Sequence, residues 1–421
     1  MEEIKINHIT KIEGHSKLHL KYDKKTKKVK VCELDVFESP RYFEALIKNR
    51  DCKEVPYLAG RICGICNVAH LTGSILAVED ALDLKVSEQT KKLRELMLLG
   101  AMFHSHVLQL YFLALPDYLG YSSALDMKGS DLKLLERCMN LKEIGNDIVN
   151  VIGGRSMHPL TPTLGGFRKL PSNDEMTKLL KKLKSARKDA MDTVKLFSSI
   201  DSPGFERKNN FLSLKSDVKY PFMGADVGTS FKESFGPEKY PEKLKEMVMK
   251  HSTSKHVTLK GQSYMVGPLA RININSKNLK KDARDLFEGE TNDIFYANTA
   301  RALETLHCID RSIEILEELE IKNEKIREIK YKNCEGVSAT EAPRGILFHR
   351  YKINKDGKVT FVDIIPPTTQ NVLNMEDSIR EILPKFMDNP KKKIRIEIEK
   401  LIRAYDPCFS CSAHFLDLNF I

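Results

Sequence analysis

The sequence predicts an α+β protein, mainly α, in which long helices form a bundle core and small antiparallel sheets are attached to it. Two observations favour this class over an alternating α/β fold. Apolar residues recur at helical spacing over several long stretches. Two segments with period-two alternation, one near each end of the chain, are typical of β-hairpins rather than of strands inserted between helices.

Each element follows from its own pattern. The stretch 16–36 alternates as SKLHLKY, turns at DKKTKK and returns as VKVCELDVF, which predicts a hairpin. A second hairpin is expected at 345–365, around the turn Asn354–Gly357. The region 201–275 is rich in Gly, Pro, Ser and Lys, and its HVTL and RININ pieces are expected to be extended. Helices are predicted at Leu71–Leu82, Leu93–Tyr118 (ending near Pro116), 131–152, 175–198, 282–320 and 391–404.

Composition limits the class of protein. The chain has 421 residues, of which 41% are apolar and 30% charged, so it can bury a sizeable core and disorder is excluded for most of it. We find no run of about 18 uncharged apolar residues, which predicts no membrane span. The first residues, MEEIKINHITKIEGH, carry no apolar signal region. We therefore expect a soluble, cytoplasmic protein.

The net charge of +10 allows two interpretations. A basic surface can attract nucleic acid or an acidic partner. Scattered lysine clusters are more often solvated helix faces, and no basic stretch here alternates with stacking aromatics. We therefore expect no nucleic-acid binding.

The nine cysteines divide into two groups. An odd number without a secretory signal does not fit a disulfide framework. Two Cys-x-x-Cys pairs are present, Cys63/Cys66 and Cys408/Cys411. The other five are isolated and are expected to be buried apolar residues: Cys32, Cys52, Cys138, Cys308 and Cys334.

Three chemistries suit the paired cysteines. A structural zinc site is the commonest, but its pairs usually lie 15–20 residues apart. Cys66 and Cys408 are 342 positions apart, so a shared site would join the two ends of the fold. A dithiol redox pair requires a βαβ context that the pattern does not show. The third is a catalytic centre with a soft, redox-active metal.

Further motifs favour the third chemistry. In order along the chain they are Ile12-Glu13-Gly14-His15, Pro40-Arg41-Tyr42-Phe43-Glu44, RICGIC with His70, Ser105-His106, Leu115-Pro116-Asp117, Gly153-Gly154-Arg155 with His158-Pro159, Gly267-Pro268-Leu269-Ala270-Arg271, Glu341-Ala342-Pro343-Arg344-Gly345, Pro367-Thr368-Thr369-Gln370-Asn371 and DPCFSCSAH. With these motifs, the chain resembles the large, catalytic subunit of nickel–iron hydrogenases from about residue 4 to residue 414. The resemblance implies that family's large-subunit fold.

The resemblance also implies a reaction and a metal centre. Cys63, Cys66, Cys408 and Cys411 would bind nickel, and Cys66 and Cys411 would bridge to an iron with carbonyl and cyanide ligands. The reaction would be reversible heterolytic cleavage of dihydrogen to protons and electrons, which needs a nearby base and a dry pocket. Cys408 and then Glu13 would take the proton. Arg344 would lie over the open metal position as an electrostatic group.

Other residues receive supporting roles by the same resemblance. Pro367 and Thr368, with Arg344, would line the diatomic ligands of the iron. Glu44 and His414 would bind magnesium or a second iron, a hard set of donors; a surface position is the alternative for Glu44. His70 would support Cys66. His158 would face the small subunit, unless it is an ordinary core histidine. Two departures from the family pattern, Lys11 in place of Arg and Gln109 in place of His, lie outside the expected metal ligands.

Electrons must leave the chain, because the five isolated cysteines match no iron–sulfur motif and no nucleotide-binding fingerprint is present. An iron–sulfur small subunit is therefore expected, with further electron-transfer subunits such as a heterodisulfide reductase or a flavin/NAD(P) module. The acceptor could equally be ferredoxin or a deazaflavin. The length and the final histidine resemble the cytoplasmic, multimeric branch, including methanogen-type, sulfhydrogenase and deazaflavin-reducing members.

The family's processing suggests how the chain is organised. A maturation endopeptidase would remove residues 415–421 as a propeptide. Residues 1–414 would form one interwoven domain, with a hairpin region (1–38), a helical core (40–200 and 276–330), a hairpin (345–365) and a C-terminal helix with the metal motif (391–414). The alternatives are a non-catalytic zinc-binding or assembly protein and the related quinone-binding respiratory subunit, which lacks the nickel cysteines.

Overall fold

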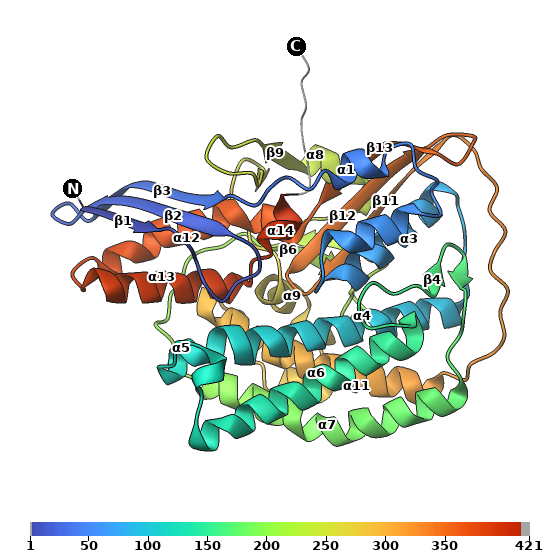
Figure 1. Cartoon of the computed structure of the whole chain (residues 1–421), viewed down its shortest axis with the longest axis horizontal. Coiled ribbons are helices and arrows are strands. Elements are labelled where there is room, and N and C mark those ends of the chain that lie inside the picture. Colours follow the sequence, from blue (N-terminus) through green and yellow to red (C-terminus); the bar gives the residue numbers. More distant parts are fainter. Residues whose placement is uncertain (1, 414–421) are drawn as a thin grey trace, which may run out of the picture.

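A computed structural model describes residues 2–413 of the chain. Long helices form one side of the molecule, and small antiparallel sheets with shorter helices cover the other (Figure 1). The expectation of a mainly α, α+β architecture is confirmed. His414 and residues 415–421 lie outside the described part of the chain, so the expectations for them stay predictions.

The N-terminal hairpin is confirmed and extended by one strand. β2 (Ser16–Asp23) pairs with β3 (Lys28–Val36), and β1 (Glu2–Ile6) adds to the free edge of β2 in the order β1-β2-β3. Along β2 every second side chain is buried, which is the period expected of a sheet with one covered face. The covering element is α12 (Pro367–Phe386), which packs against β3.

Four long helices make up the bundle at the bottom of Figure 1. Ser87 caps the first of them, accepting a hydrogen bond from the Thr90 N–H at 3.1 Å. The first two helices cross closely, because a Cβ added at Gly145 would lie 2.8 Å from the carbonyl oxygen of Gly100. The bundle helices are α4 (Glu88–Leu108), α6 (Leu132–Gly153), α7 (Asn173–Ser199) and α11 (Ala297–Glu318).

In this region one helix prediction is confirmed and another needs correction. The helix predicted for Leu93–Tyr118 ends at Leu119, close to Pro116: a π-helical turn, Gln109–Ala114, leads into α5 (Leu115–Leu119), where the proline occupies the first turn. Proline is tolerated there because its missing N–H has no helical partner. The stretch 282–320 is not one helix. It contains a short α10 (Lys281–Asp285), an irregular segment with Gly289 at φ +120°, and then α11.

One helical segment is longer and more apolar than expected. The segment Glu88–Leu119 contains an 18-residue window with a mean hydropathy of 1.4 and at most two charged residues. Of that window, 78% is buried inside the fold, as expected for the central helix of a bundle. It is long and apolar enough to cross a membrane by composition alone, but its apolar surface is already covered by protein.

The second hairpin is also confirmed, within a three-stranded sheet. β12 (Gly345–Ile353) pairs with β13 (Val359–Ile365) and with the unpredicted β11 (Cys334–Ala342). Helix α3 (Asn67–Ala81), close to its predicted position, packs on β11 and β12. The C-terminal α13 (Lys391–Tyr405) matches its prediction, and the short α14 (Phe409–Ser412) follows it.

Two further elements were not foreseen. The 20-residue α12 was missed as a helix. RININ is helical, in α9 (Pro268–Asn275), whereas HVTL is strand β10 (His256–Leu259) as expected. The remaining elements are α1 (Phe43–Ile47), α2 (Val55–Ala59), α8 (Tyr240–Lys243), β4 (Pro162–Thr163), β5 (Gly166–Phe167), β6 (Leu212–Lys215), β7 (Asp226–Thr229), β8 (Ser234–Phe235), β9 (Leu244–Met247) and the single 3-10 turns η1 (Gly60–Ile62), η3 (Ala124–Asp126), η4 (Gly129–Asp131), η5 (Pro237–Lys239), η6 (Ser276–Asn278) and η7 (Ile294–Tyr296).

Candidate metal centre

Two helix starts position the four paired cysteines. Cys63 follows η1, and Cys66 is the N-cap residue of α3. Cys408 is the N-cap residue of α14, and Cys411 lies within that turn. All four side chains are buried. Because helix N-termini favour negative charge, both turns suit cysteines in the thiolate form.

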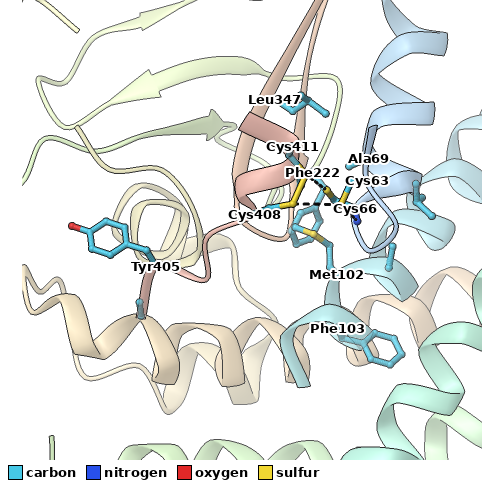
Figure 2. Close-up of a cluster of buried hydrophobic side chains, with 14 of the residues drawn as sticks. Cys63, Cys66, Ala69, Met102, Phe103, Phe222, Leu347, Tyr405, Cys408 and Cys411 are labelled. Carbon is cyan, nitrogen blue, oxygen red and sulfur yellow. Dashed lines mark hydrogen bonds between the residues drawn. A yellow bond between two sulfur atoms is a disulfide. The ribbon is translucent and has the colours of Figure 1, made fainter. Parts of the chain in front are cut away.

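The four sulfur atoms converge at the centre of the molecule (Figure 2). The Sγ atoms of Cys63 and Cys408 are 3.6 Å apart, and those of Cys66 and Cys411 are 3.4 Å apart. All four lie within 4.8 Å of one another. The predicted meeting of the two motifs is therefore present, across 345 positions of sequence.

The second pair is joined as a disulfide, Cys408–Cys411, whereas Cys63 and Cys66 are free. The sequence predicted no disulfide framework, and this is the one cross-link among the described residues. Metal ligation needs thiolates, so the second pair must be reduced before it can bind an ion. In that form the set offers four soft donors, which fit a transition metal such as nickel and also zinc. The residues around the sulfurs distinguish the two.

Local charge favours ionisation of one thiol in the first pair. Burial opposes it, but hydrogen bonding from Cys66 and the charge of Arg344 together lower the pKa of the Cys63 thiol. Part of that hydrogen bonding is the Cys66 N–H, which donates to the Cys63 Sγ at 3.0 Å. Burial raises the pKa of Cys66 well above its ordinary value. A bound cation is therefore needed to hold both as thiolates.

Arg344 lies in the turn between β11 and β12 and is held by Asp406. Its Nε donates to the Asp406 carbonyl oxygen at 2.8 Å and its Nη2 to the carboxylate at 3.0 Å. Burial disfavours the charge, but Asp406 and the thiols of Cys66 and Cys63 hold the pKa of Arg344 above its ordinary value. The buried Nη1 has no hydrogen-bond partner among the described residues. The guanidinium is thus a fixed positive charge with a donor to spare beside the sulfurs.

A second buried arginine holds this turn in place. Arg271 donates from Nη1 to the carbonyl oxygen of Ala342 at 2.9 Å and from Nη2 to that of Pro343 at 3.2 Å. Its charge is paired with Glu304 at 2.6 Å, and both side chains are fully buried. The motif that contains Arg271 is visible in the sequence, but no role was predicted for this arginine. The sequence feature that could have indicated its role is a charged residue at the end of the otherwise apolar run Gly-Pro-Leu-Ala-Arg.

Glu13 reaches the second cysteine motif from the other end of the chain. Its backbone forms a parallel bridge with Cys408, and its carbonyl oxygen accepts from the Phe409 N–H at 3.0 Å. Its carboxylate accepts from the Ser410 hydroxyl and, at 3.3 Å, from the Ser410 N–H. Gly14 permits this approach: its φ is +82°, and an added Cβ would lie 2.8 Å from the Ser410 nitrogen. Ser410, between the two cysteines, was not singled out from the sequence.

The first turn of α12 also meets the site. Pro367 begins the helix, and the Thr368 Oγ1 accepts a hydrogen bond from the Cys408 N–H at 2.9 Å. The neighbouring Thr369 Oγ1 is buried and without a hydrogen-bond partner among the described residues. With Arg344 Nη1, this gives two unused donors close to the cysteine loops, and such atoms are suited to a polar or anionic ligand.

His70 and His158 have other observed partners. The Nδ1 of His70 lies 3.3 Å from the Nε2 of His349, and its backbone N–H donates to the carbonyl oxygen of Cys66 at 3.2 Å. The Nδ1 of His158 lies 3.0 Å from the carbonyl oxygen of Gly60, three residues before Cys63. His158 is partly exposed, so it is not a core histidine.

Glu44 lies apart from the sulfurs, beside the end of β13. Its Oε1 accepts from the Ile364 N–H at 2.9 Å. Two partly buried carboxylates are close to it: burial raises the pKa values of both Glu246 and Asp363, and the charge of Glu44 adds to the effect. Three carboxylates in one place suit a hard cation. The expected second ligand, His414, is outside the described residues.

The two departures from the family pattern are explained by contacts away from the sulfurs. Lys11 forms an ion pair with Asp117, which also pairs with Arg403 at 2.5 Å. The Nε2 of Gln109 donates to the carbonyl oxygen of Arg403 at 2.5 Å. Both residues therefore anchor α13, the helix that leads into the second cysteine motif.

Known proteins resemble this chain over nearly its whole length. The family model described as nickel-dependent hydrogenase matches residues 41–143 and 215–414. The alpha chain of sulfhydrogenase 1 from Pyrococcus furiosus is 35% identical over 99% of this chain and 98% of its own length. A component of the F420-non-reducing hydrogenase vhu from Methanococcus voltae is 32% identical over 92% of this chain and its own full length.

A solved structure agrees in fold. The crystal structure of an NAD+-reducing nickel–iron hydrogenase in the H2-reduced state superposes with a TM-score of 0.90 at 25% identity, covering 98% of this chain and all of that one. The matched family model spans both cysteine motifs. The chain belongs to the nickel-dependent hydrogenase family, as a large, catalytic subunit with a cysteine cluster able to bind the metal.

Proposed function

We propose that the four cysteines hold the nickel at which this subunit cleaves dihydrogen reversibly to protons and electrons. Cys63 and Cys408 would be terminal ligands, and Cys66 and Cys411 would also bridge to an iron carrying carbonyl and cyanide. The observation that carries the proposal is the approach of the sulfurs, 3.6 Å and 3.4 Å apart, in a buried position. When bound, the metals supply the redox-active, Lewis-acidic centre that polarises the hydrogen molecule.

The protein's own part begins with the proton. Cys408 accepts it, and Glu13 receives it next, because the Glu13 backbone runs alongside Cys408. Ser410 holds the Glu13 carboxylate through two hydrogen bonds, so the acceptor is fixed in place before a proton arrives. Glu13 is partly exposed, whereas the sulfurs are buried. The carboxylate therefore lies between the buried sulfurs and the protein surface, where a proton can leave to solvent.

Arg344 contributes charge rather than base chemistry. The pairing with Asp406 keeps it protonated, and its unused Nη1 is available to a group bound between the cysteine pairs. The hydroxyl of Thr369 is a second unused donor at the start of α12. We assign Arg344, Pro367 and the neighbouring threonines to the walls that hold the anionic cyanide ligands, as donors fixed before the ligands bind.

A magnesium ion, or a second iron, is proposed near Glu44 and His414. The support is the proximity of three carboxylates, Glu44 and the partly buried Glu246 and Asp363. Lys255 pairs with Glu246 at 3.0 Å, and a hard divalent ion would compensate the remaining negative charge. His70 is proposed to support Cys66 through the carbonyl oxygen to which its backbone is bonded.

Electrons are proposed to leave through an iron–sulfur small subunit. The relatives are named as single components of larger assemblies. Exposed apolar side chains surround His158 and the Arg41 segment: Tyr42, Met157 and Leu160. The Nη1 of Arg41 donates to the carbonyl oxygen of Ile62, next to Cys63, at 2.7 Å. This surface therefore lies beside the metal motif and suits a docking partner.

The final electron acceptor belongs to further subunits. A heterodisulfide reductase, ferredoxin, a deazaflavin or NAD(P) would each be compatible with this chain. The names of the compared proteins cover several of these branches, among them sulfhydrogenase, F420-non-reducing and NAD+-reducing enzymes. We place the assembly in the cytoplasm, with residues 415–421 removed by a maturation endopeptidase.

The test is metal analysis of the subunit purified anaerobically with its natural partners, with infrared spectroscopy of the diatomic stretching region. Nickel and iron near one each per subunit, together with carbonyl and cyanide bands, is the expected result. Zinc alone in mature protein that has lost residues 415–421 by mass spectrometry would overturn the proposal. If those residues are still present, zinc indicates an unmatured precursor, and the measurement is repeated on the processed form.

A further inference from the structure

A second group of metal-binding side chains lies away from the cysteines. His251, His256 and Glu376 each offer one ligand atom, and these atoms lie within 4.8 Å of one another. They come from different elements: His251 from the loop before β10, His256 from the first position of β10, and Glu376 from the middle of α12. No motif in the sequence suggested this group.

The distances centre on one carboxylate oxygen. The His251 Nε2 is 3.3 Å from the Glu376 Oε1, and the His256 Nε2 is 3.9 Å from the same atom. The second distance is too long for a hydrogen bond. In a tetrahedral zinc site with ligands about 2.0 Å from the ion, ligand atoms are about 3.3 Å apart. A shift of about half an ångström in His256 would therefore bring its Nε2 to that separation from the Glu376 Oε1.

One ring nitrogen of His256 is buried without a hydrogen-bond partner among the described residues. The atom is Nε2, and the side chain of His256 is 1% exposed. A buried polar atom without a partner usually marks a water or an ion. Here the nitrogen belongs to a group that also contains an imidazole and a carboxylate.

Of the two carboxylate oxygens of Glu376, Oε1 is the one placed to bind an ion. Its Oε2 is 3.4 Å from the Nη2 of Arg380, and its Oε1 accepts from the Leu34 N–H at 2.8 Å. The Oε1 is also the atom nearest to both histidines. The carboxylate is 3% exposed and its contact with Arg380 is long, so a cation at Oε1 would further stabilise the buried charge.

We propose that His251, His256 and Glu376 bind one zinc ion. Two imidazoles and one carboxylate are donors that zinc accepts in tetrahedral sites, with water in the fourth position. That water can enter from a surface hollow of about 610 Å³ that His251 lines. The ion would tie β10 to α12, which pack against each other, and α12 in turn packs against β3. Its effect is structural: it fixes the helix whose first turn carries Thr368.

The full-length chain in its nickel-loaded complex provides the test. The complex is treated with a chelator, dialysed and titrated with zinc chloride; bound zinc is then counted by elemental analysis and its ligands are identified by zinc X-ray absorption. We expect one zinc per chain with nitrogen and oxygen ligands only. His256→Gln and His251→Gln should each weaken binding by about 100-fold. His19→Gln, which alters an exposed histidine lining the same hollow, should bind zinc as the wild type does.

Two results would overturn the proposal: no zinc bound at tenfold molar excess, or zinc bound by both histidine variants as tightly as by the wild type. Zinc with sulfur ligands would place the ion in the cysteine centre and would equally overturn it. Because His256 is buried, its variant could fail to fold. His251 is only partly buried, so the unfolding midpoint of His251→Gln without zinc should equal that of the wild type without zinc.

Discussion

Replacing Gly14 by Ala tests whether the N-terminal segment holds the second cysteine motif in place. At Gly14 the added Cβ would lie 2.8 Å from the Ser410 nitrogen and 2.9 Å from the Phe409 Cβ, and φ is +82°. A left-handed residue other than glycine costs about 1–2 kcal/mol. Overpacking adds about 1–3 kcal/mol. The strain is relieved if Glu13 moves away from Ser410.

Gly120→Ala is the matched control. Its φ is +81°, but an added Cβ meets nothing within 4 Å. It therefore has the same backbone cost without the steric one. The difference between the two variants isolates the contact with residues 409 and 410, and about 1–3 kcal/mol corresponds to a loss of roughly 5- to 150-fold in the population that holds Glu13 in place.

The assay is proton–deuterium exchange with dihydrogen, measured anaerobically and expressed per bound nickel. We expect exchange per nickel, or the nickel content measured separately, to fall by that factor in Gly14→Ala relative to Gly120→Ala. Equal nickel content and equal exchange in the two variants would refute the argument. The approach of Glu13 to the Cys408–Ser410 turn would then have no part in catalysis.

The remaining predictions address single groups. Cys408→Ser should lose nickel and hydrogen uptake together, whereas Cys308→Ser, at a buried isolated cysteine, should keep both in elemental analysis and uptake assays. Glu13→Gln should keep nickel but slow proton–deuterium exchange; exchange at full speed would remove this carboxylate from the proton route. Arg344→Lys keeps a charge but loses the fork to Asp406, so uptake should fall by about 10²–10³ with nickel content unchanged. Burial lowers the pKa of His307 from 6.5 to about 3. The unfolded chain therefore binds a proton that the folded protein excludes, so the free energy of unfolding should fall as the pH drops below 6.5. The loss from this residue is about 2 kcal/mol at pH 5. In denaturant titrations, the free energy of unfolding of His307→Gln should fall by that much less between pH 7 and pH 5.

The elements predicted correctly are those whose apolar pattern decides their structure. Both hairpins and five of the six predicted helices follow their alternation or helical spacing to within a few residues. Helix α12 was missed for the opposite reason. Its first turns contain Thr368, Thr369, Gln370 and Asn371, which are polar and yet buried. Thr368 bonds to Cys408, Gln370 to the Ile346 carbonyl oxygen and Asn371 to the Val266 N–H. A search for an apolar stripe cannot find such a helix.

A difference between the local sequence pattern and the tertiary contacts also explains why α9 was not predicted as a helix. The run RININ alternates as a strand would, but Pro268 starts a helix in which Arg271 and Asn275 are buried. Their partners are backbone carbonyl oxygens far along the chain, at Ala342 and Leu214. Such tertiary contacts, rather than local propensity, decide the structure there. At the site, resemblance supplied Glu13 and Arg344, whereas Ser410, Asp406 and Arg271 act only through contacts that the sequence does not display.

The place of the metal motif in the fold has a consequence for assembly. Glu13 and Cys408 pair along their backbones although they are almost the whole chain apart. Thr368 accepts from the Cys408 N–H, and Asp406 accepts from Arg344, so residues from three separate segments fix the second cysteine loop. The first pair needs only η1 and the start of α3. Two sulfurs can therefore be in position before the other two arrive. A metal loaded onto Cys63 and Cys66 would be enclosed when residues 406–411 close over it, which makes closure of the C-terminal segment the last step in building the site.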